Sequence, residues 1–374
     1  MTRSFAAFKP ESASDQCALE LAEAQIKALG WSFVWLTPES GASPLWFHGM
    51  LKSEGVTDLI AINRFRGSLE GHLPPHIRCH TLVTSLPPEW LGPSQHTQPH
   101  DRVSLMNPYA LAEAASLFNA LPATWPTASW SAPFPLKDIP IICIADHPSR
   151  TFAEALGAHK SLGPMMLRVL RALEESPAYL SRDQLDLLMA LSERATGIQI
   201  LNSTHRERLL SLIQAHVLAP QNARKTLVDL VRHNPGLPLT LVGHGWDVEP
   251  ELAAYAQPTP RPAGLAALLA RSRILLAPHA IETMLPGPDL AAAASARVCP
   301  LIAHPESTPL PPNLWGMPQA HDLGTLSDRL AELLSQPSAT AKVALDFSLA
   351  WDVGIKELVW NPSETSEGPI RKAT

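Results

Sequence analysis

Short apolar runs alternate with longer amphipathic segments along most of the chain. In the N-terminal part, a helix is predicted over residues 14–30, capped by Ser14 or Asp15, with leucine, alanine and isoleucine side chains along one face. No strand is predicted ahead of this helix. The elements predicted after it are strands over 31–36, 58–63 and 77–83, a loop over 91–101 and a helix over 109–121.

The C-terminal part continues the same alternation. Its most informative stretch is the apolar run at 237–242, which ends in the glycine turn Gly243-His244-Gly245-Trp246. Glycine permits close approach of a ligand to the backbone, so this turn predicts a ligand crevice at the carboxyl end of a buried parallel strand. Helices that alternate with short apolar strands are typical of an α/β domain with a parallel sheet. The other elements predicted here are strands over 138–146, 272–279 and 297–304, and helices over 165–175, 182–194, 204–216, 223–232, 265–271, 326–334 and 340–360.

Composition narrows the class of protein. With 374 residues, the chain is long enough for two domains of ordinary size. A formal net charge of -6 gives no basic surface, so no nucleic-acid partner is predicted. The four cysteines lack metal or disulfide spacing, which fits a reducing compartment. Because we find neither a signal peptide nor a bilayer-spanning run, we expect a cytoplasmic protein, with peripheral membrane contact left open.

Several weak motifs occur in an informative order. They are Asp-x-Ile-x-x-Asn at 58–63, Leu-Pro at 73–74, a strand at 81–87, Asp-Ile-Pro at 138–140, Gly-x-Gly-Trp at 243–246, Ser-x-Ile-x-Leu at 272–276, and an alanine-rich helix with its strand at 291–302. In this order the chain resembles two-domain glycosyltransferases of the GT-B fold, of the spore-maturation type known as glycosyl transferases group 1-like. The resemblance covers most of the chain.

The resemblance implies two Rossmann-like domains that face a cleft, with a nucleotide diphosphate sugar as donor and no metal or other cofactor. The first domain, on the acceptor side, would cover residues 1–137, and a proline-rich connection would lie at 122–140. The second domain, on the nucleotide-sugar side, would cover residues 138–340. A terminal helix over 341–362 is expected to pack back on the first domain, and residues 363–374 are expected to be a disordered tail.

The implied function is transfer of a hexosyl unit from the donor to a polysaccharide, lipid or protein acceptor. The departing diphosphate needs charge stabilisation, which backbone N–H groups at helix N-termini supply without a metal. The donor site would lie in an open cleft at the carboxyl edge of the second sheet, faced by the bend at 242–247. Its candidate residues are Arg150, Gly243, His244, Gly245, Trp246, His279, Glu282 and Asp289, with Lys160 as a further phosphate-binding candidate.

Each candidate also has a structural interpretation. The loop at 145–150 is explained equally by a solvated loop with an aspartate cap, and Trp246 by a core residue that seals a strand against a helix. His279 is explained by a surface residue, and Glu282 and Asp289 by solvated loop carboxylates. For a general base in the first domain, three side chains remain open alternatives: His48, Asp58 and Glu39.

The chain departs from the family pattern at several positions. Where the family places an acidic residue for the donor ribose, alanine stands here, and Asp289 is slightly displaced. Ala296 and Arg297 replace the usual glycine after the alanine-rich helix, and Ser85 replaces an aspartate after the third strand. These losses keep open a second function, a catalytically inactive binding or scaffold protein. An epimerase on the same fold is a third alternative.

Two other clusters carry less weight. Metal-type ligands occur at His76, Cys79 and His80 and at His96 and His100, but neither group forms a tetrahedral set, so no metal site is predicted. Three aromatic residues of the connection are explained either by a sugar-stacking platform or by packing of an interdomain linker: Trp125, Trp130 and Phe134.

Overall fold

The computed structural model describes two parallel sheets, most of their helices and part of an inserted helical region. The described residues are 3–10, 12–37, 44–69, 73–84, 100–106, 121–123, 137–148, 163–175, 182–200, 206–207, 209–210, 213, 217–260, 264–278, 287–304, 314 and 316–355.

The first sheet has six parallel strands in the order β2-β1-β3-β4-β5-β6. Strand β2 lies on one side of β1 and β3 lies on the other, so the strand order reverses at β1. A topological switch point therefore lies between β1 and β3. The elements of this unit are β1 (Ser4–Phe8), α1 (Ala13–Ala28), β2 (Ser32–Leu36), α2 (Pro44–Ser53), β3 (Asp58–Ile62), η1 (Arg66–Leu69), β4 (Arg78–Val83), β5 (Arg102–Leu105) and β6 (Leu121–Pro122).

Strand β1 corrects the sequence prediction, which placed no strand ahead of the first helix. Its five residues pair with β2, the central three also pair with β3, and Phe5 and Ala7 are fully buried. Its serine and two alanines give only a weak apolar pattern. The helix also begins earlier than predicted, because Ser12 is the cap and its Oγ accepts the backbone N–H of Asp15 at 3.0 Å.

The second sheet also has six parallel strands, in the order β12-β11-β10-β7-β8-β9. This is the strand order of the Rossmann fold, with its switch point between β7 and β10. The elements are β7 (Ile139–Ile144), α8 (Ala219–His233), β8 (Leu239–Val242), η5 (Trp246–Val248), β9 (Ala256–Gln257), α9 (Gly264–Arg271), β10 (Ser272–Ala277), α10 (Pro288–Ser295), β11 (Cys299–Ala303), β12 (Gln319–Ala320), α11 (Leu323–Ser335) and α12 (Pro337–Ile355).

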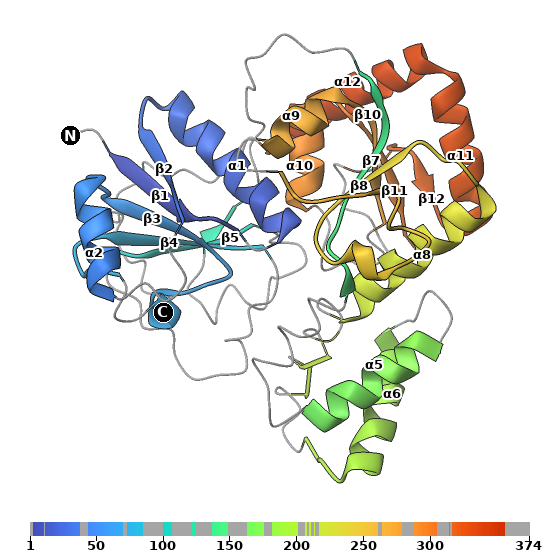
Figure 1. The fold of residues 1–374 in the computed structure, drawn as a ribbon, viewed down its shortest axis with the longest axis horizontal. Coiled ribbons are helices and arrows are strands. Elements are labelled where there is room, and N and C mark those ends of the chain that lie inside the picture. The colour runs from blue at the N-terminus through green and yellow to red at the C-terminus, as the bar shows by residue number, and fades with distance from the viewer. Residues whose placement is uncertain are drawn as a thin grey trace, which may run out of the picture.

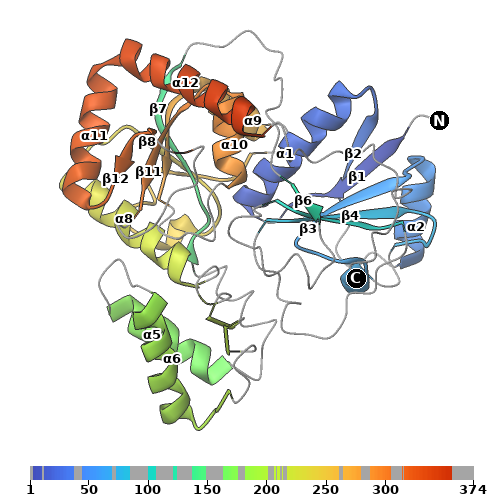
Figure 2. The ribbon, with the colours of Figure 1, turned by 180° about the vertical axis from the view of Figure 1, so that it is seen from behind.

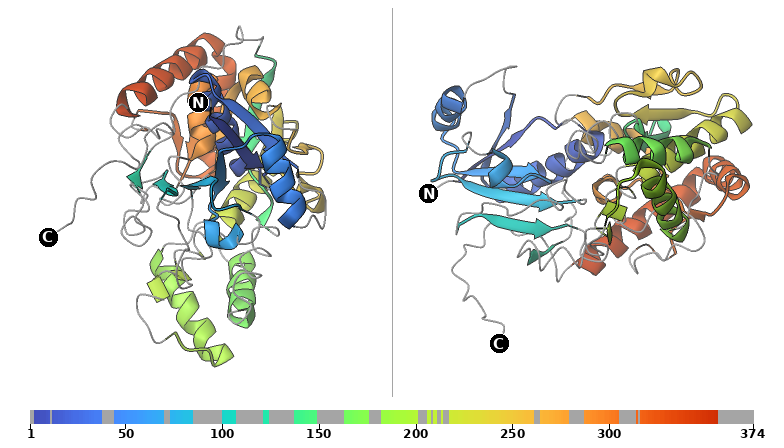
Figure 3. Two further views of the ribbon diagram at one scale, coloured as in Figure 1. Left: turned by 90° about the vertical axis from the view of Figure 1, so that its left-hand side faces the viewer. Right: turned by 90° about the horizontal axis from the view of Figure 1, so that it is seen from below.

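The two parallel Rossmann-like sheets confirm the predicted fold class of an α/β protein with two Rossmann-like domains. In Figures 1 and 2, α1 lies between the first sheet and the helices α9 and α10 of the second unit. The view from below in Figure 3 shows the blue helix α1 in the same place. The chain passes from one sheet to the other between β6 and β7, the interval that contains the predicted boundary at 137/138.

Helix α12 differs from the predicted terminal helix. As far as Ile355 it packs on α10, α11, β10 and β11, and its Phe347 is fully buried, so this part belongs to the second unit (Figures 1 and 2). The described residues do not show the expected return to the first domain. The rest of the predicted helix, at 356–362, and the predicted tail at 363–374 lie outside the described residues.

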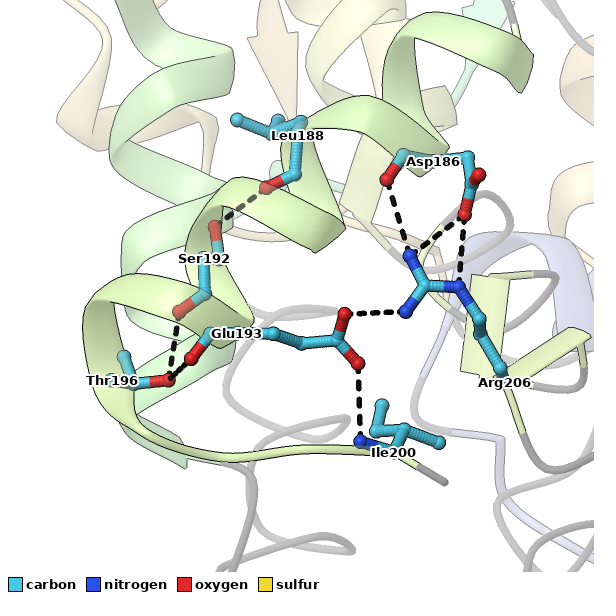
Figure 4. A network of polar contacts seen from close by, with 7 residues as sticks. All are labelled: Asp186, Leu188, Ser192, Glu193, Thr196, Ile200 and Arg206. Carbon is cyan, nitrogen blue, oxygen red and sulfur yellow. Dashed lines mark hydrogen bonds and ion pairs between the residues drawn. The ribbon is translucent and has the colours of Figure 1, made fainter. Parts of the chain in front are cut away.

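A helical insertion between β7 and α8 forms a separate lobe, seen below the two sheets in Figure 1. It contains α5 (Gly163–Glu175) and α6 (Arg182–Thr196), and the described residues of the predicted helix at 204–216 are helical. Arg206 links the lobe internally, because its Nε and Nη2 donate to Asp186 Oδ1 at 3.0 and 2.9 Å (Figure 4). Its Nη1 donates to Glu193 Oε2 at 2.5 Å. The buried apolar residues of the lobe include Met165, Val169, Leu173, Leu185, Met189 and Ile213.

None of the helices in the described part of the chain has the length and apolar composition needed to cross a bilayer.

Candidate functional site

The two switch points are joined directly by one carboxylate. Asp146 follows β7, and its Oδ2 accepts the backbone N–H of Ala13, the first residue of α1, at 2.9 Å. Its Oδ1 accepts the backbone N–H of His244, in the bend after β8, at 2.7 Å. Because α1 follows β1 and Asp146 follows β7, the carboxyl ends of the two central strands face each other here.

The glycine bend lies at the carboxyl end of β8, where the sequence placed it. A Cβ atom on Gly243 would lie 1.8 Å from the carbonyl oxygen of Ala145, so glycine is required by the neighbouring backbone of the protein itself. Gly245, the N-cap residue of η5, has φ 82, a left-handed conformation that favours glycine. The backbone of His244 is fixed on both sides, since its carbonyl accepts the N–H of His147 at 2.8 Å.

Trp246 is a core residue. Its side chain is only 1% exposed, and its Nε1 donates to the carbonyl oxygen of Ala145 at 2.6 Å. The indole also meets the ring of His147 edge to face, with centroids 5.2 Å apart. Trp246 therefore affects a ligand only through the backbone that it holds.

A charged cluster lies beside this bend. The carboxylate of Glu249 forms an ion pair with the guanidinium of Arg224, and His147 Nε2 lies 3.7 Å from Glu249 Oε2. Burial and the positive charge of Arg224 lower the pKa of His147, and the carboxylate of Glu249 opposes this shift. The cluster connects α8 to the carboxyl ends of β7 and β8.

Asp289 is a buried carboxylate in the first turn of α10, with 4% of its surface exposed. This position corrects the interpretation as a solvated loop residue. The negative charge of Asp289 acts on thiols in both units. Burial of each thiol and the charge of Asp289 raise the pKa of Cys17 in α1 and of Cys143 in β7. The Sγ of Cys17 in turn donates to the carbonyl of Pro288 at 3.4 Å.

The remaining donor-site candidates lie outside the described residues, so their roles stay predictions. They are Arg150, Lys160, His279 and Glu282; the base candidate Glu39, the histidine His96 and the aromatic residues Trp125, Trp130 and Phe134 lie outside as well.

Of the base candidates in the first unit, Asp58 is poorly placed for chemistry at the carboxyl edge. It begins β3, so it lies at the amino end of the sheet, and it is fully buried. Its oxygens are engaged by His80 Nε2 at 2.8 Å and by the hydroxyl of Thr57 at 2.6 Å. His48 is half-buried on α2. Among the described residues, no group of three or more His, Cys, Asp or Glu side chains is arranged to hold a metal ion.

Sequence reasoning did not identify Asp146 as the link between the sheets. It recognised an aspartate with capping potential in the loop after β7, but the helix that Asp146 contacts belongs to the other unit, 133 positions away. No periodicity or local motif reports a partner at that separation. The sequence does offer one signal: β1 and β7 are short apolar strands, and each is followed within two residues by a charged residue.

Comparison with known proteins adds only distant likenesses. No protein-family model and no curated protein matches the chain. Among solved structures, it is similar to a proposed UDP-N-acetylglucosamine 2-epimerase from Listeria monocytogenes, with 8% identity, a TM-score of 0.40, and 92% of this chain and 91% of that chain covered. A glycosyltransferase from Rickettsia africae has 10% identity and a TM-score of 0.39 over 95% and 94% of the two chains. The glycosyltransferase SnogD from Streptomyces nogalater has 12% identity and a TM-score of 0.37 over 96% of each. At these TM-scores the likenesses carry no argument about activity.

Proposed function

We propose that this chain is a glycosyltransferase that uses a nucleotide diphosphate sugar as its donor. The observation that supports the proposal is the link between the two switch points through Asp146 and Ala13. Ligands of open α/β sheets bind outside the carboxyl ends of the strands at a switch point. With two such points face to face, a donor on the second sheet and an acceptor on the first would meet at one place.

In this proposal the second sheet holds the donor. Helix α10 has no side-chain cap at Gly287, and its first residue, Pro288, has no N–H, so the backbone N–H groups that follow Pro288 in the first turn would receive the diphosphate, and Arg150 would neutralise further charge. Asp289, in the same turn, would take the role of the acidic residue that binds the donor ribose. His244, His279 and Glu282 would complete the donor site. The backbone donors would stabilise the charge that develops on the diphosphate as the bond to the sugar breaks.

A catalytically inactive scaffold is the second candidate function, and one observation favours it. The carboxylate of Asp146 already accepts the N–H groups of Ala13 and His244, positions that an anionic ligand would otherwise use. Because these two N–H groups are already bound by a carboxylate, fewer backbone donors remain for the phosphates of a donor sugar.

A thermal-shift screen tests the proposal. The full chain is heated with UDP, GDP, ADP, CMP and their sugar derivatives, because a ligand that binds only the folded state stabilises it by about 2.7 kcal/mol at 100 times its Kd. We expect at least one of these compounds to raise Tm. Asp289→Asn should weaken binding of that compound about tenfold, since a hydrogen bond to a charged carboxylate becomes a weaker one to a neutral amide oxygen. Asp328→Asn, on the exposed surface of α11, is the matched control.

A turnover measurement separates the two functions. The compound that raises Tm is incubated with the protein as its sugar derivative, and release of the nucleotide by slow hydrolysis of the donor is followed. Release that exceeds the buffer rate indicates a transferase. Binding without release favours the scaffold, and no shift with any nucleotide contradicts the proposed function.

A further inference from the structure

We propose that Asp146 and Glu20 form an interdomain latch that holds the two sheets in one closed arrangement. Each of these carboxylates lies in one unit and caps backbone N–H groups that belong to a helix of the other unit. The capping is therefore reciprocal across the junction seen between α1 and the helices α9 and α10 in Figures 1 and 2.

Asp146 provides the first point of the latch. Within α1, Ser12 satisfies the N–H of Asp15, and the N–H of Ala13 is donated to Asp146 instead. The other oxygen of Asp146 accepts the N–H of His244. One side chain thus fastens the end of β7, the bend after β8 and the start of α1. A carboxylate at a helix N-terminus is also favoured by the helix dipole.

Glu20 provides the second point. It lies seven residues after Ala13, two turns along α1, and its side chain is buried with 4% of the residue exposed. Its oxygens accept the N–H of Leu265 at 3.4 Å and of Ala266 at 2.8 Å, in the first turn of α9. Gln16 reinforces this contact, because its Nε2 donates to Glu20 Oε1 at 2.8 Å and to the carbonyl of Pro260 at 3.0 Å.

Apolar packing between the two points gives the latch its strength. A single buried cluster runs from Cys17 and Leu21 of α1 into Leu290 and the four alanines 291–294 of α10, all fully or almost fully buried. Alanine side chains let the two helix backbones approach closely. Units joined by a polar, wet interface are expected to move relative to each other, whereas a continuous apolar core resists this. The alanine run is therefore explained by the junction, independently of any ligand.

The latch predicts that the two sheets unfold together and do not open freely. Hydrogen exchange of the full chain without ligand is measured for the wild type, Glu20→Ala, Asp146→Ala and the double variant. We expect Glu20→Ala to speed exchange about tenfold in the first turn of α9, since a charged hydrogen bond is removed, and also to speed exchange in α1 and α10. Exchange that changes in α9 alone would show a local cap and overturn the latch.

Two further measurements keep the proposal testable if an alanine variant folds poorly. Glu20→Gln retains one acceptor oxygen and should give an intermediate effect, while Glu332→Ala, on the exposed surface of α11, should leave exchange at the junction unchanged. In calorimetry, the two sheets of the wild type should melt in one transition, which the double variant should split into two. Independent melting of the two sheets in the wild type would overturn the proposal. Because no nucleotide is present, the result does not depend on the proposed function.

Discussion

The indole Nε1 of Trp246 donates a hydrogen bond to the carbonyl oxygen of Ala145 at 2.6 Å, across 101 positions of sequence. This bond ties the bend after β8 to the end of β7. Together with the close packing of Gly243 on the same carbonyl, it makes the bend a fixed part of the second unit. The glycine bend, which the sequence predicted to bind a ligand, thus connects the ends of two neighbouring strands.

Substitution of Trp246 should separate its core role from ligand binding. Trp246→Phe keeps most of the buried ring but leaves the carbonyl of Ala145 without this donor, so we expect a loss of about 1–2 kcal/mol in the free energy of unfolding. Trp246→Ala also opens a cavity and should cost about 3–5 kcal/mol. Denaturant unfolding measures both values. In Trp246→Phe the loss of stability should exceed any loss of nucleotide affinity, and a stable Trp246→Ala protein would contradict the core assignment.

Gly243→Ala should destabilise the second unit much more than a glycine substitution elsewhere. The added Cβ would lie 1.8 Å from Ala145 O, and neither backbone segment is free to shift because Asp146 and Trp246 fix both. Gly236→Ala is the control, because Gly236 has φ 81 and open space around it. The control therefore carries only the cost of left-handed backbone, about 1–2 kcal/mol. Equal melting temperatures for the two variants would show that the bend is looser than described.

Acid stability should depend on Asp58. Burial raises the pKa of Asp58, but hydrogen bonds from His80 and Thr57 and the positive charges of His80 and Arg78 together hold it below its usual value. A carboxyl whose pKa is lower in the folded state stabilises fully above its unfolded pKa of about 4, and this contribution is lost as the pH falls through the folded value.

The corresponding experiment compares free energies of unfolding below about pH 4 with those at neutral pH. Asp58→Asn cannot ionise, so its stability should fall less steeply with acid than that of the wild type. Asp328→Asn on α11 should keep the wild-type slope. Parallel curves for the wild type and Asp58→Asn would show that the pair with His80 does not persist in solution.

Arg206→Met should loosen the helical lobe without disturbing the two sheets. The variant keeps an unbranched apolar side chain but loses the bonds to Asp186 and Glu193 shown in Figure 4. We expect faster hydrogen exchange in α5 and α6 by about tenfold, a loss typical of a hydrogen-bonded charge pair. Arg194→Met, exposed on α6, is the control. Faster exchange spread over both sheets would mean that the lobe is not a separate unit.

The sequence predicted the second sheet better than the first, for a physical reason. Strands such as β8 and β10 contain several large apolar residues and end at glycine or proline, a pattern that can be recognised locally. β1 is equally buried, but Ser4, Ala6 and Ala7 make up three of its five residues and give a weak apolar pattern. The strands β9 and β12, at the edges of the second sheet, have two residues each, too few to show a period. The strands that the sequence did not predict are those whose conformation depends on pairing with other strands more than on their own residues.

The site shows the same limit. The position of the bend at 243–246 followed from its own residues, whereas its contacts with Ala145 and Asp146 depend on the sheet. Arg297 shows that a left-handed backbone conformation can be kept after the glycine that usually adopts it is replaced. It takes φ 50 just after α10, where the resemblance leads one to expect glycine.

Hydrogen exchange with and without a nucleotide diphosphate sugar shows whether a donor binds where the two switch points meet. The donor found in the thermal-shift screen is added to the full chain, and protection is mapped along the sequence. We expect new protection at the carboxyl ends of β7 and β8, around residues 145–148 and 243–246, and in the first turn of α10. Protection confined to other regions, or none at a saturating donor concentration, would contradict a donor site at the junction of the two switch points.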